Sequence, residues 1–194
     1  MKVKVLGCSG GIGGKHLRTT SFRVDNDILI DAGTGVGDLS LTELSMIDHI
    51  FLTHSHLDHI VTIPFIVDTV GAMRDKPLTV YGIEETLDTL KKHIFNWSVW
   101  PDFTAIPTAE TPFMRYQAIK EGQTLALDGR MLTVLPAKAE RIASAFQSLP
   151  EVKHVPVHVV AQPELLPLIH SSHGTEHPTA VRSSRSTRKH MTKT

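Results

Sequence analysis

Hydrophobic and polar positions divide the first 137 residues into alternating strands and helices. Polar and apolar residues alternate from Lys2 to Leu6, as they do in a half-buried strand. Further short apolar runs predict strands, and apolar residues at helical spacing predict helices. The strands are expected at residues 2–6, 22–24, 28–30, 47–53, 78–81, 123–127 and 131–135, and the helices at 39–46, 60–73 and 84–95. This alternation is typical of an α/β sandwich.

Turn residues and burial patterns specify how some of these strands connect. Asp25-Asn-Asp27 and Asp128-Gly129 each separate two apolar runs, which predicts two tight hairpins. Residues 47–53 are mostly apolar on both faces, as expected of a strand within a sheet that is covered on both sides.

The composition changes beyond Ala137. Only one aromatic residue, Phe146, and one glycine, Gly174, follow it. A helix over 138–149 and a strand over 155–160 are weakly indicated, whereas residues 182–194 carry five Lys or Arg residues and no acid. We therefore expect a folded domain at 1–137, a divergent and weakly structured segment at 138–181, and a disordered basic tail at 182–194.

Charge and cysteine content narrow the class of protein. Twenty basic residues balance twenty acidic ones, which gives no reason to expect a nucleic-acid partner. The start of the chain lacks the apolar core of a signal peptide, and we find no apolar run of the roughly 20 residues that cross a bilayer. The single cysteine, Cys8, excludes an internal disulfide and is expected to be buried. A cytoplasmic protein without a membrane partner is expected.

Ligand-type side chains cluster where the strand at 47–53 ends, in Thr53-His-Ser-His-Leu-Asp-His59. On an extended backbone His54 and His56 point to the same side, and Asp58 and His59 follow at the turn into the next helix. Imidazole and carboxylate groups suit zinc. A solvated helix N-terminus would explain Asp58 as a cap but not three histidines. We therefore predict a metal centre held by His54, His56, Asp58 and His59.

This segment resembles the HxHxDH signature of the metallo-β-lactamase superfamily. Ile28-Leu-Ile-Asp-Ala-Gly33 resembles the strand and aspartate that precede that signature. Two less specific segments resemble the bacterial class II 3',5'-cyclic-nucleotide phosphodiesterase branch. They are Leu6-Gly-Cys-Ser-Gly-Gly11 and Phe95-Asn-Trp-Ser-Val-Trp-Pro-Asp-Phe103. The resemblance covers residues 1 to about 137.

The resemblance implies a metallo-β-lactamase-type αββα sandwich and a metal-dependent hydrolase of small cyclic phosphodiesters of the cAMP type. Two zinc ions would be bound, one by His54 and His56 and the other by Asp58 and His59, with Mn²⁺ or Fe²⁺ as alternatives. A metal-bound hydroxide would be the nucleophile, and Asp58 could act catalytically by orienting it. Asp31 would act through a hydrogen bond to a ligating histidine.

The second half of the chain departs from the family pattern. The next expected histidine is replaced by Pro136-Ala-Lys-Ala-Glu140, and no aspartate follows Asp128 to serve as the bridging ligand. Histidines further on could substitute; they are His154, His158, His170 and His173. We interpret this half as truncated, divergent or frame-shifted, which predicts fewer than two ions, an uncovered apolar face and self-association.

Two other functions stay open. The chain could be a metal-binding remnant without catalytic activity, or another hydrolase of the superfamily, such as a ribonuclease Z-like or thioester-cleaving enzyme. The aromatic residues Trp97, Trp100 and Phe103 could stack on a purine base, although covering the core is the preferred interpretation.

Overall fold

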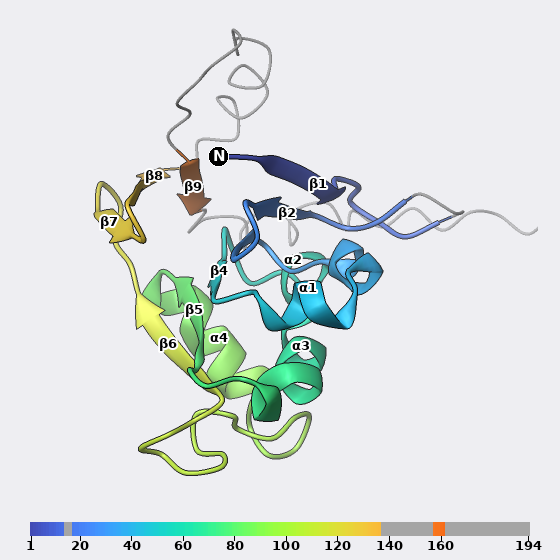
Figure 1. Ribbon diagram of the computed structural model, residues 1–194, viewed down its shortest axis with the longest axis vertical. Coiled ribbons are helices and arrows are strands. Elements are labelled where there is room, and N and C mark those ends of the chain that lie inside the picture. The colour runs from blue at the N-terminus through green and yellow to red at the C-terminus, as the bar shows by residue number, and fades with distance from the viewer. Residues whose placement is uncertain (14–16, 137–156, 162–194) are drawn as a thin grey trace, which may run out of the picture. The chain divides into compact units, whose positions relative to one another are not determined.

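The computed structural model describes residues 1–13, 17–136 and 157–161, all of which lie within the unit Met1–Pro163. They form one sheet of six strands and one of three strands, with helices in the connections (Figure 1). The six-stranded sheet contains, in spatial order, β1 (Val3–Gly7), β2 (Ser21–Val24), β3 (Ile28–Ile30), β4 (His49–Phe51), β5 (Leu78–Gly82) and β6 (Met114–Ala118). The three-stranded sheet contains β7 (Thr124–Leu127), β8 (Arg130–Pro136) and β9 (Val157–Ala161). The helices are η1 (Thr34–Asp38), α1 (Leu41–Ser45), α2 (Leu57–Ile60), α3 (Ile63–Val70), η2 (Gly71–Met73) and α4 (Glu84–His93).

Connection length determines strand direction in the larger sheet. The short turn between β2 and β3 reverses the chain, and β1, β2 and β3 are antiparallel neighbours. The pairs β3–β4, β4–β5 and β5–β6 are parallel, because a longer connection returns the chain to the same edge before each new strand. The carboxyl ends of β3 and β4 therefore meet at one edge of the sheet.

Alternation along the central strands divides the core into two clusters. Leu29, Ile50 and Val80 point to one face and pack in a cluster that includes the buried side of α3. Their neighbours Ile28, Phe51 and Tyr81 point to the other face, where Leu132 and Val134 of β8 cover them. Helices on one face and a second sheet on the other confirm the predicted α/β sandwich.

The helix expected at 60–73 is divided into α2, α3 and η2. The amide of Thr62 donates to the carbonyl oxygen of Ala32 at 3.0 Å, outside the helix, and Pro64 at the start of α3 has no amide hydrogen to continue the ladder. The expected helix at 39–46 begins at Leu41, capped by Ser40 in a capping box with Glu43.

The remaining predictions concern one strand that the sequence did not reveal, the burial of Cys8, and the residues beyond 137. Strand β6 was not predicted, because its sequence Met-Arg-Tyr-Gln-Ala has no apolar run. Cys8 is exposed, so its expected burial is wrong. The strand weakly indicated at 155–160 is confirmed as β9, which pairs in parallel with β8. The helix expected at 138–149 and the tail at 182–194 lie outside the described residues, as do His154, His170 and His173.

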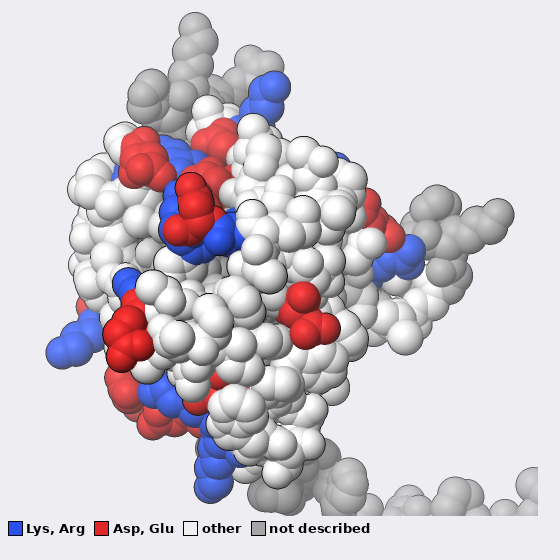
Figure 2. Space-filling view, turned by 60° about the horizontal axis from the view of Figure 1, so that its bottom comes forward, with Lys and Arg blue, Asp and Glu red and all other residues white. Residues whose placement is uncertain are grey.

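Surface charge is mixed. On the face shown in Figure 2, acidic and basic side chains lie side by side around a broad uncharged area. Ion pairs occur on the surface of the described chain, such as Arg18 with Asp38 at 3.0 Å and Arg23 with Glu43 at 2.8 Å. None of the helices in the described part of the chain is long and apolar enough to cross a membrane.

Candidate metal centre

The HxHxDH motif, residues 54–59, begins where β4 leaves the sheet. Leu52 is still buried and donates its amide to Tyr81 of β5 at 2.8 Å, after which the chain turns outward into α2. Asp31 follows β3 at the same edge, and its amide donates to Phe51 at 2.8 Å. The parallel register thus places the Asp31 loop against the motif, at the sheet edge where α/β proteins commonly bind ligands.

All four predicted ligands lie together. The ring centroids of His54 and His56 are 4.5 Å apart, and those of His54 and His59 are 4.1 Å apart. A carboxylate oxygen of Asp58 lies 3.4 Å from His59 Nε2. These side chains are all partly exposed, so an ion and a substrate can reach them.

A buried carboxylate, Asp31, anchors this group. It is 1% exposed and accepts hydrogen bonds from the Thr53 amide (2.9 Å) and hydroxyl (2.8 and 3.0 Å). The Nδ1 atom of His59 lies 2.7 Å from Asp31 Oδ2, the oxygen that also accepts the 2.8 Å hydrogen bond from the Thr53 hydroxyl. The φ of Asp31, 57°, lies in the left-handed region, which aspartate tolerates better than most residues. The expected hydrogen bond between Asp31 and a motif histidine is present.

The hydrogen bonds around Asp31 also set the tautomers of two histidines. An ionised carboxylate only accepts, so neutral His59 carries its proton on Nδ1 and leaves Nε2 with a free lone pair. The Thr53 hydroxyl donates its one hydrogen to Asp31 and can only accept from His54 Nδ1, which is 3.0 Å away. The lone pair of His54 Nε2 is therefore free as well.

Protonation states favour the same chemistry. Burial lowers the pKa of His54 to about 4, with smaller contributions from His59 and His56, so its imidazole is neutral at physiological pH. Burial also opposes charge on His59, but the hydrogen bond and charge of Asp31 and the charge of Asp58 outweigh it and raise the pKa of His59. A metal ion would displace that proton on binding.

A close approach of backbones holds the Asp31 loop against the motif. A side-chain carbon added at Gly33 would lie 2.4 Å from Thr19 Oγ1 and 2.5 Å from the main-chain oxygen of Asp58. Thr62 adds a hydroxyl hydrogen bond to the Ala32 carbonyl at 2.8 Å. Only glycine fits at position 33, which gives a structural reason for the Asp-Ala-Gly sequence.

The aromatic segment is mostly structural. Phe103 is buried in the core, and Trp100 is partly buried with its ring 5.1 Å from Phe65. These two residues agree with the preferred interpretation. Trp97 is 65% exposed at a φ of 64°, so it does not cover the core.

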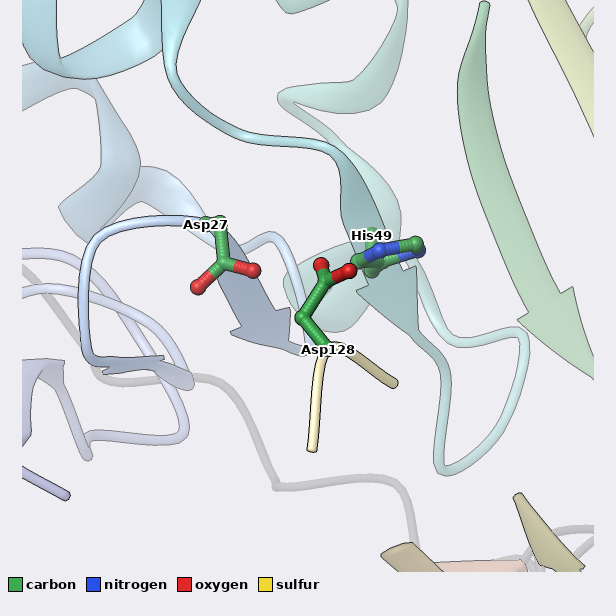
Figure 3. Close-up of side chains that lie close together, drawn as sticks. All are labelled: Asp27, His49 and Asp128. Carbon is green, nitrogen blue, oxygen red and sulfur yellow. The ribbon is translucent and has the colours of Figure 1, made fainter. Parts of the chain in front are cut away.

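A second group of ligand-type residues was not predicted. Asp27, His49 and Asp128 each offer a ligand atom, and these atoms all lie within 4.8 Å of one another (Figure 3). In the part of the chain that the structure describes, this is the only group of at least three His, Cys, Asp or Glu residues whose ligand atoms all lie within 4.8 Å of one another. The ligand atoms of the HxHxDH motif are therefore farther apart. The three residues come from separate segments, and no local sequence pattern connects them.

Comparison with known proteins agrees with this geometry. The family described as "cAMP phosphodiesterases class-II" matches residues 41–165, more than half of the chain and past the change of composition at 137. A probable 3',5'-cyclic-nucleotide phosphodiesterase of Yersinia pestis is 28% identical over 159 residues, which cover 68% of this chain and 45% of the relative. Ribonuclease Z of Clostridium beijerinckii is 36% identical over 104 residues, 49% of this chain and 34% of the relative. The chain thus spans less than half the length of these two relatives.

One solved structure supports the fold, and a second is similar to part of this chain. The crystal structure of unliganded yeast PDE1 aligns with a TM-score of 0.52 and 20% identity, over 66% of this chain and 53% of that one. The metallo-β-lactamase fold protein YhfI from Bacillus subtilis aligns with a TM-score of 0.48 and 17% identity, over 74% of this chain and 67% of that one. The predicted fold class and family resemblance are confirmed.

Proposed function

This chain belongs to the class II cAMP phosphodiesterase family, and from that premise we propose that it hydrolyses a 3',5'-cyclic nucleotide at a metal centre held by His54, His56, Asp58 and His59. The observation that carries the proposal is the arrangement around Asp31, which leaves the Nε2 atoms of His54 and His59 free. Because the chain spans 45% of the Yersinia pestis relative, the relative's activity is a proposal for this chain.

The donor set fits a divalent ion of the zinc type. Neutral imidazole nitrogens and a carboxylate oxygen are zinc ligands, and a buried carboxylate that fixes the tautomer of a ligating histidine is a common supporting contact. His54 and His56 would hold one ion and Asp58 and His59 a second, with Mn²⁺ and Fe²⁺ as alternatives. Such ions make water more acidic and stabilise negative charge on phosphate oxygens.

The protein's own groups would orient water and substrate. Asp58 lies beside His59 and its side chain is 33% exposed, so it can accept a hydrogen bond from a water molecule that attacks phosphorus. The attack forms one P–O bond and breaks one ester P–O bond of the ring, which gives a phosphomonoester. The proton from water passes to a site carboxylate or to solvent, and the leaving alkoxide takes up a proton.

The test is turnover of 3',5'-cyclic AMP by the purified chain loaded with zinc, manganese or iron(II). We expect hydrolysis that stops with a chelator and returns with metal, and a fall in kcat/KM of at least about 100-fold in His54→Ala and His56→Ala, since second-sphere changes alone lower activity by 10- to 100-fold. His93→Ala, at the exposed end of α4, is the matched control. Turnover that survives both motif substitutions contradicts the proposal.

Two alternatives have specific support. The absence of a histidine from Pro136-Ala-Lys-Ala-Glu140 favours a remnant that binds metal without turnover. It predicts zinc binding that depends on His54 together with no hydrolysis of any phosphodiester. Similarity to ribonuclease Z favours a different phosphodiester substrate, which a panel including precursor transfer RNA would identify.

A further inference from the structure

The group opposite the HxHxDH motif has the composition of a second metal site. We propose that Asp27, His49 and Asp128 bind a divalent cation of the zinc type, which clips the β2–β3 turn and β4 to the β7–β8 hairpin. Figure 3 shows the three side chains converging from these separate segments, with the Asp128 carboxylate directed at the His49 ring. This site does not depend on the proposed function, because His49 begins β4 whereas His54 follows its end.

Two of the ligands are held in place by the backbone. The carbonyl oxygen of Asp27 accepts hydrogen bonds from the amides of Asp48 at 2.8 Å and His49 at 3.0 Å. These bonds fix the separation of the β2–β3 turn and the start of β4. A site built on such paired main-chain segments requires little ordering when an ion binds.

The imidazole of His49 is oriented by Tyr81. The tyrosine hydroxyl lies 3.1 Å from His49 Nδ1, and the Tyr81 ring is stacked on Phe51 with centroids 4.2 Å apart. When Nδ1–H donates to the tyrosine hydroxyl, Nε2 is the nitrogen that can coordinate, and such support of the opposite nitrogen is typical of metal-binding histidines. Burial lowers the pKa of His49, which keeps the ring neutral and able to donate its lone pair.

Asp128 comes from a tight hairpin turn. Asp128 and Gly129 have φ values of 48° and 79°, as in a two-residue turn with both central residues left-handed. Leu127 pairs with Arg130 across the turn, which fixes its register. Tetrahedral coordination places ligand atoms about 3.4 Å apart. The Asp128 side chain is 75% exposed, so it can move the short distance needed to reach that separation.

The basic groups near Asp128 make their shorter contacts with other carboxylates. Arg130 donates two hydrogen bonds to Asp27, at 2.7 and 2.5 Å, but its guanidinium is 3.9 Å from Asp128. Asp25 is paired with Arg130 and lies 3.9 Å from the N-terminal ammonium, and Lys76 is paired with Asp48 at 2.7 Å. Each Asp27 oxygen keeps a further lone pair beyond its bond to Arg130, so it can also coordinate an ion.

The chemistry of the donors identifies the class of ion. One imidazole and two carboxylates suit zinc and manganese better than calcium, which prefers six or more oxygens. Exposure of Asp128 leaves room for water to complete the coordination shell. The ion would connect the two sheets at the end of the sandwich opposite the HxHxDH motif.

Zinc alone is the probe for the test. The wild type and the variants His49→Ala, Asp128→Asn and His54→Ala would be dialysed against zinc, and bound metal measured per chain. We expect His49→Ala and Asp128→Asn each to lose one ion that the wild type binds, while Asp38→Asn, which alters an exposed aspartate paired with Arg18, loses none.

Hydrogen exchange locates the ion. Zinc at ten times its Kd should slow exchange of amides 124–133 by about tenfold if that hairpin opens only when the ion leaves. The slowing should occur in the wild type and in His54→Ala but not in Asp128→Asn.

Equal zinc content in Asp128→Asn and the wild type, or hairpin exchange that zinc does not change, overturns the proposal. Asp128→Asn carries this decision because its exposed side chain is not needed for folding, whereas His49 is partly buried. Failure of the proposed function looks different: His54→Ala then keeps its zinc or the wild type shows no turnover, while Asp128→Asn still loses one ion.

Discussion

Replacing Asp31 by asparagine separates the charge of this buried group from its shape. Asparagine accepts the left-handed backbone at φ 57° nearly as well as aspartate, so strain is not added. One oxygen can still accept from the Thr53 amide, but the amide nitrogen now faces His59 Nδ1 across 2.7 Å. That contact survives only if His59 moves its proton from Nδ1 to Nε2.

The proton shift determines the size of the effect. Loss of a charge-assisted hydrogen bond that a neutral one replaces should lower the free energy of unfolding by about 1 kcal/mol. Zinc binding suffers more, because Nε2 must lose its proton and Nδ1–H then faces an amide NH₂ group. We expect zinc affinity to fall by about 10- to 100-fold, or roughly 1.4 to 2.7 kcal/mol.

Zinc affinity can be measured by competition with a chromophoric chelator, and unfolding by urea with the metal removed. Asp38→Asn serves as the control, since it neutralises an exposed aspartate in an ion pair with Arg18. An Asp31→Asn protein that binds zinc as tightly as the wild type, while His54→Ala does not, would show that the tautomer argument is wrong.

Two further substitutions test the packing and the ion pairs. Gly33→Ala should destabilise the fold by about 1 to 3 kcal/mol, because its Cβ would lie 2.5 Å from the main-chain oxygen of Asp58, whereas Gly37→Ala meets nothing within 4 Å; equal urea midpoints would contradict this. Burial opposes ionisation of Asp48, but hydrogen bonds from Lys76 and Arg74 outweigh the effect of burial and lower the pKa of Asp48 below its ordinary value of 3.8. Asp48→Asn should thus cost about 2 kcal/mol at pH 7, where the pair is fully formed, and less as the pH falls through the lowered pKa; a pH-independent difference refutes it.

Local patterns predicted most of the sheet and the position of the HxHxDH motif. Alternation and turn residues identify β1 to β3 and the β7–β8 hairpin because their partners are close in sequence. The break between α2 and α3 could not be predicted in this way, since it depends on an amide of Thr62 that bonds to the distant Ala32. Strand β6 is held by pairing with β5 rather than by its own apolar pattern.

The two ligand groups differ in the same respect. His54, His56, Asp58 and His59 lie within six consecutive residues, so spacing alone indicates a site. The hydrogen bonds of Asp31 with Thr53 and His59 require two loops brought together by parallel strands. His49 has no ligand-type neighbour in sequence except Asp48, and its partners at 27 and 128 are determined by tertiary structure.

Strand β4 also provides a spectroscopic ruler. His49 begins it and His54 lies five residues after His49, while pairing with β3 and β5 holds residues 49–51 in an extended conformation. Five residues of fully extended chain span at most about 18 Å, so the α-carbons of the two histidines cannot be farther apart. Paramagnetic ions placed at both ends would therefore relax one another's spins strongly, and a long separation in a pulsed dipolar experiment would report two chains rather than one.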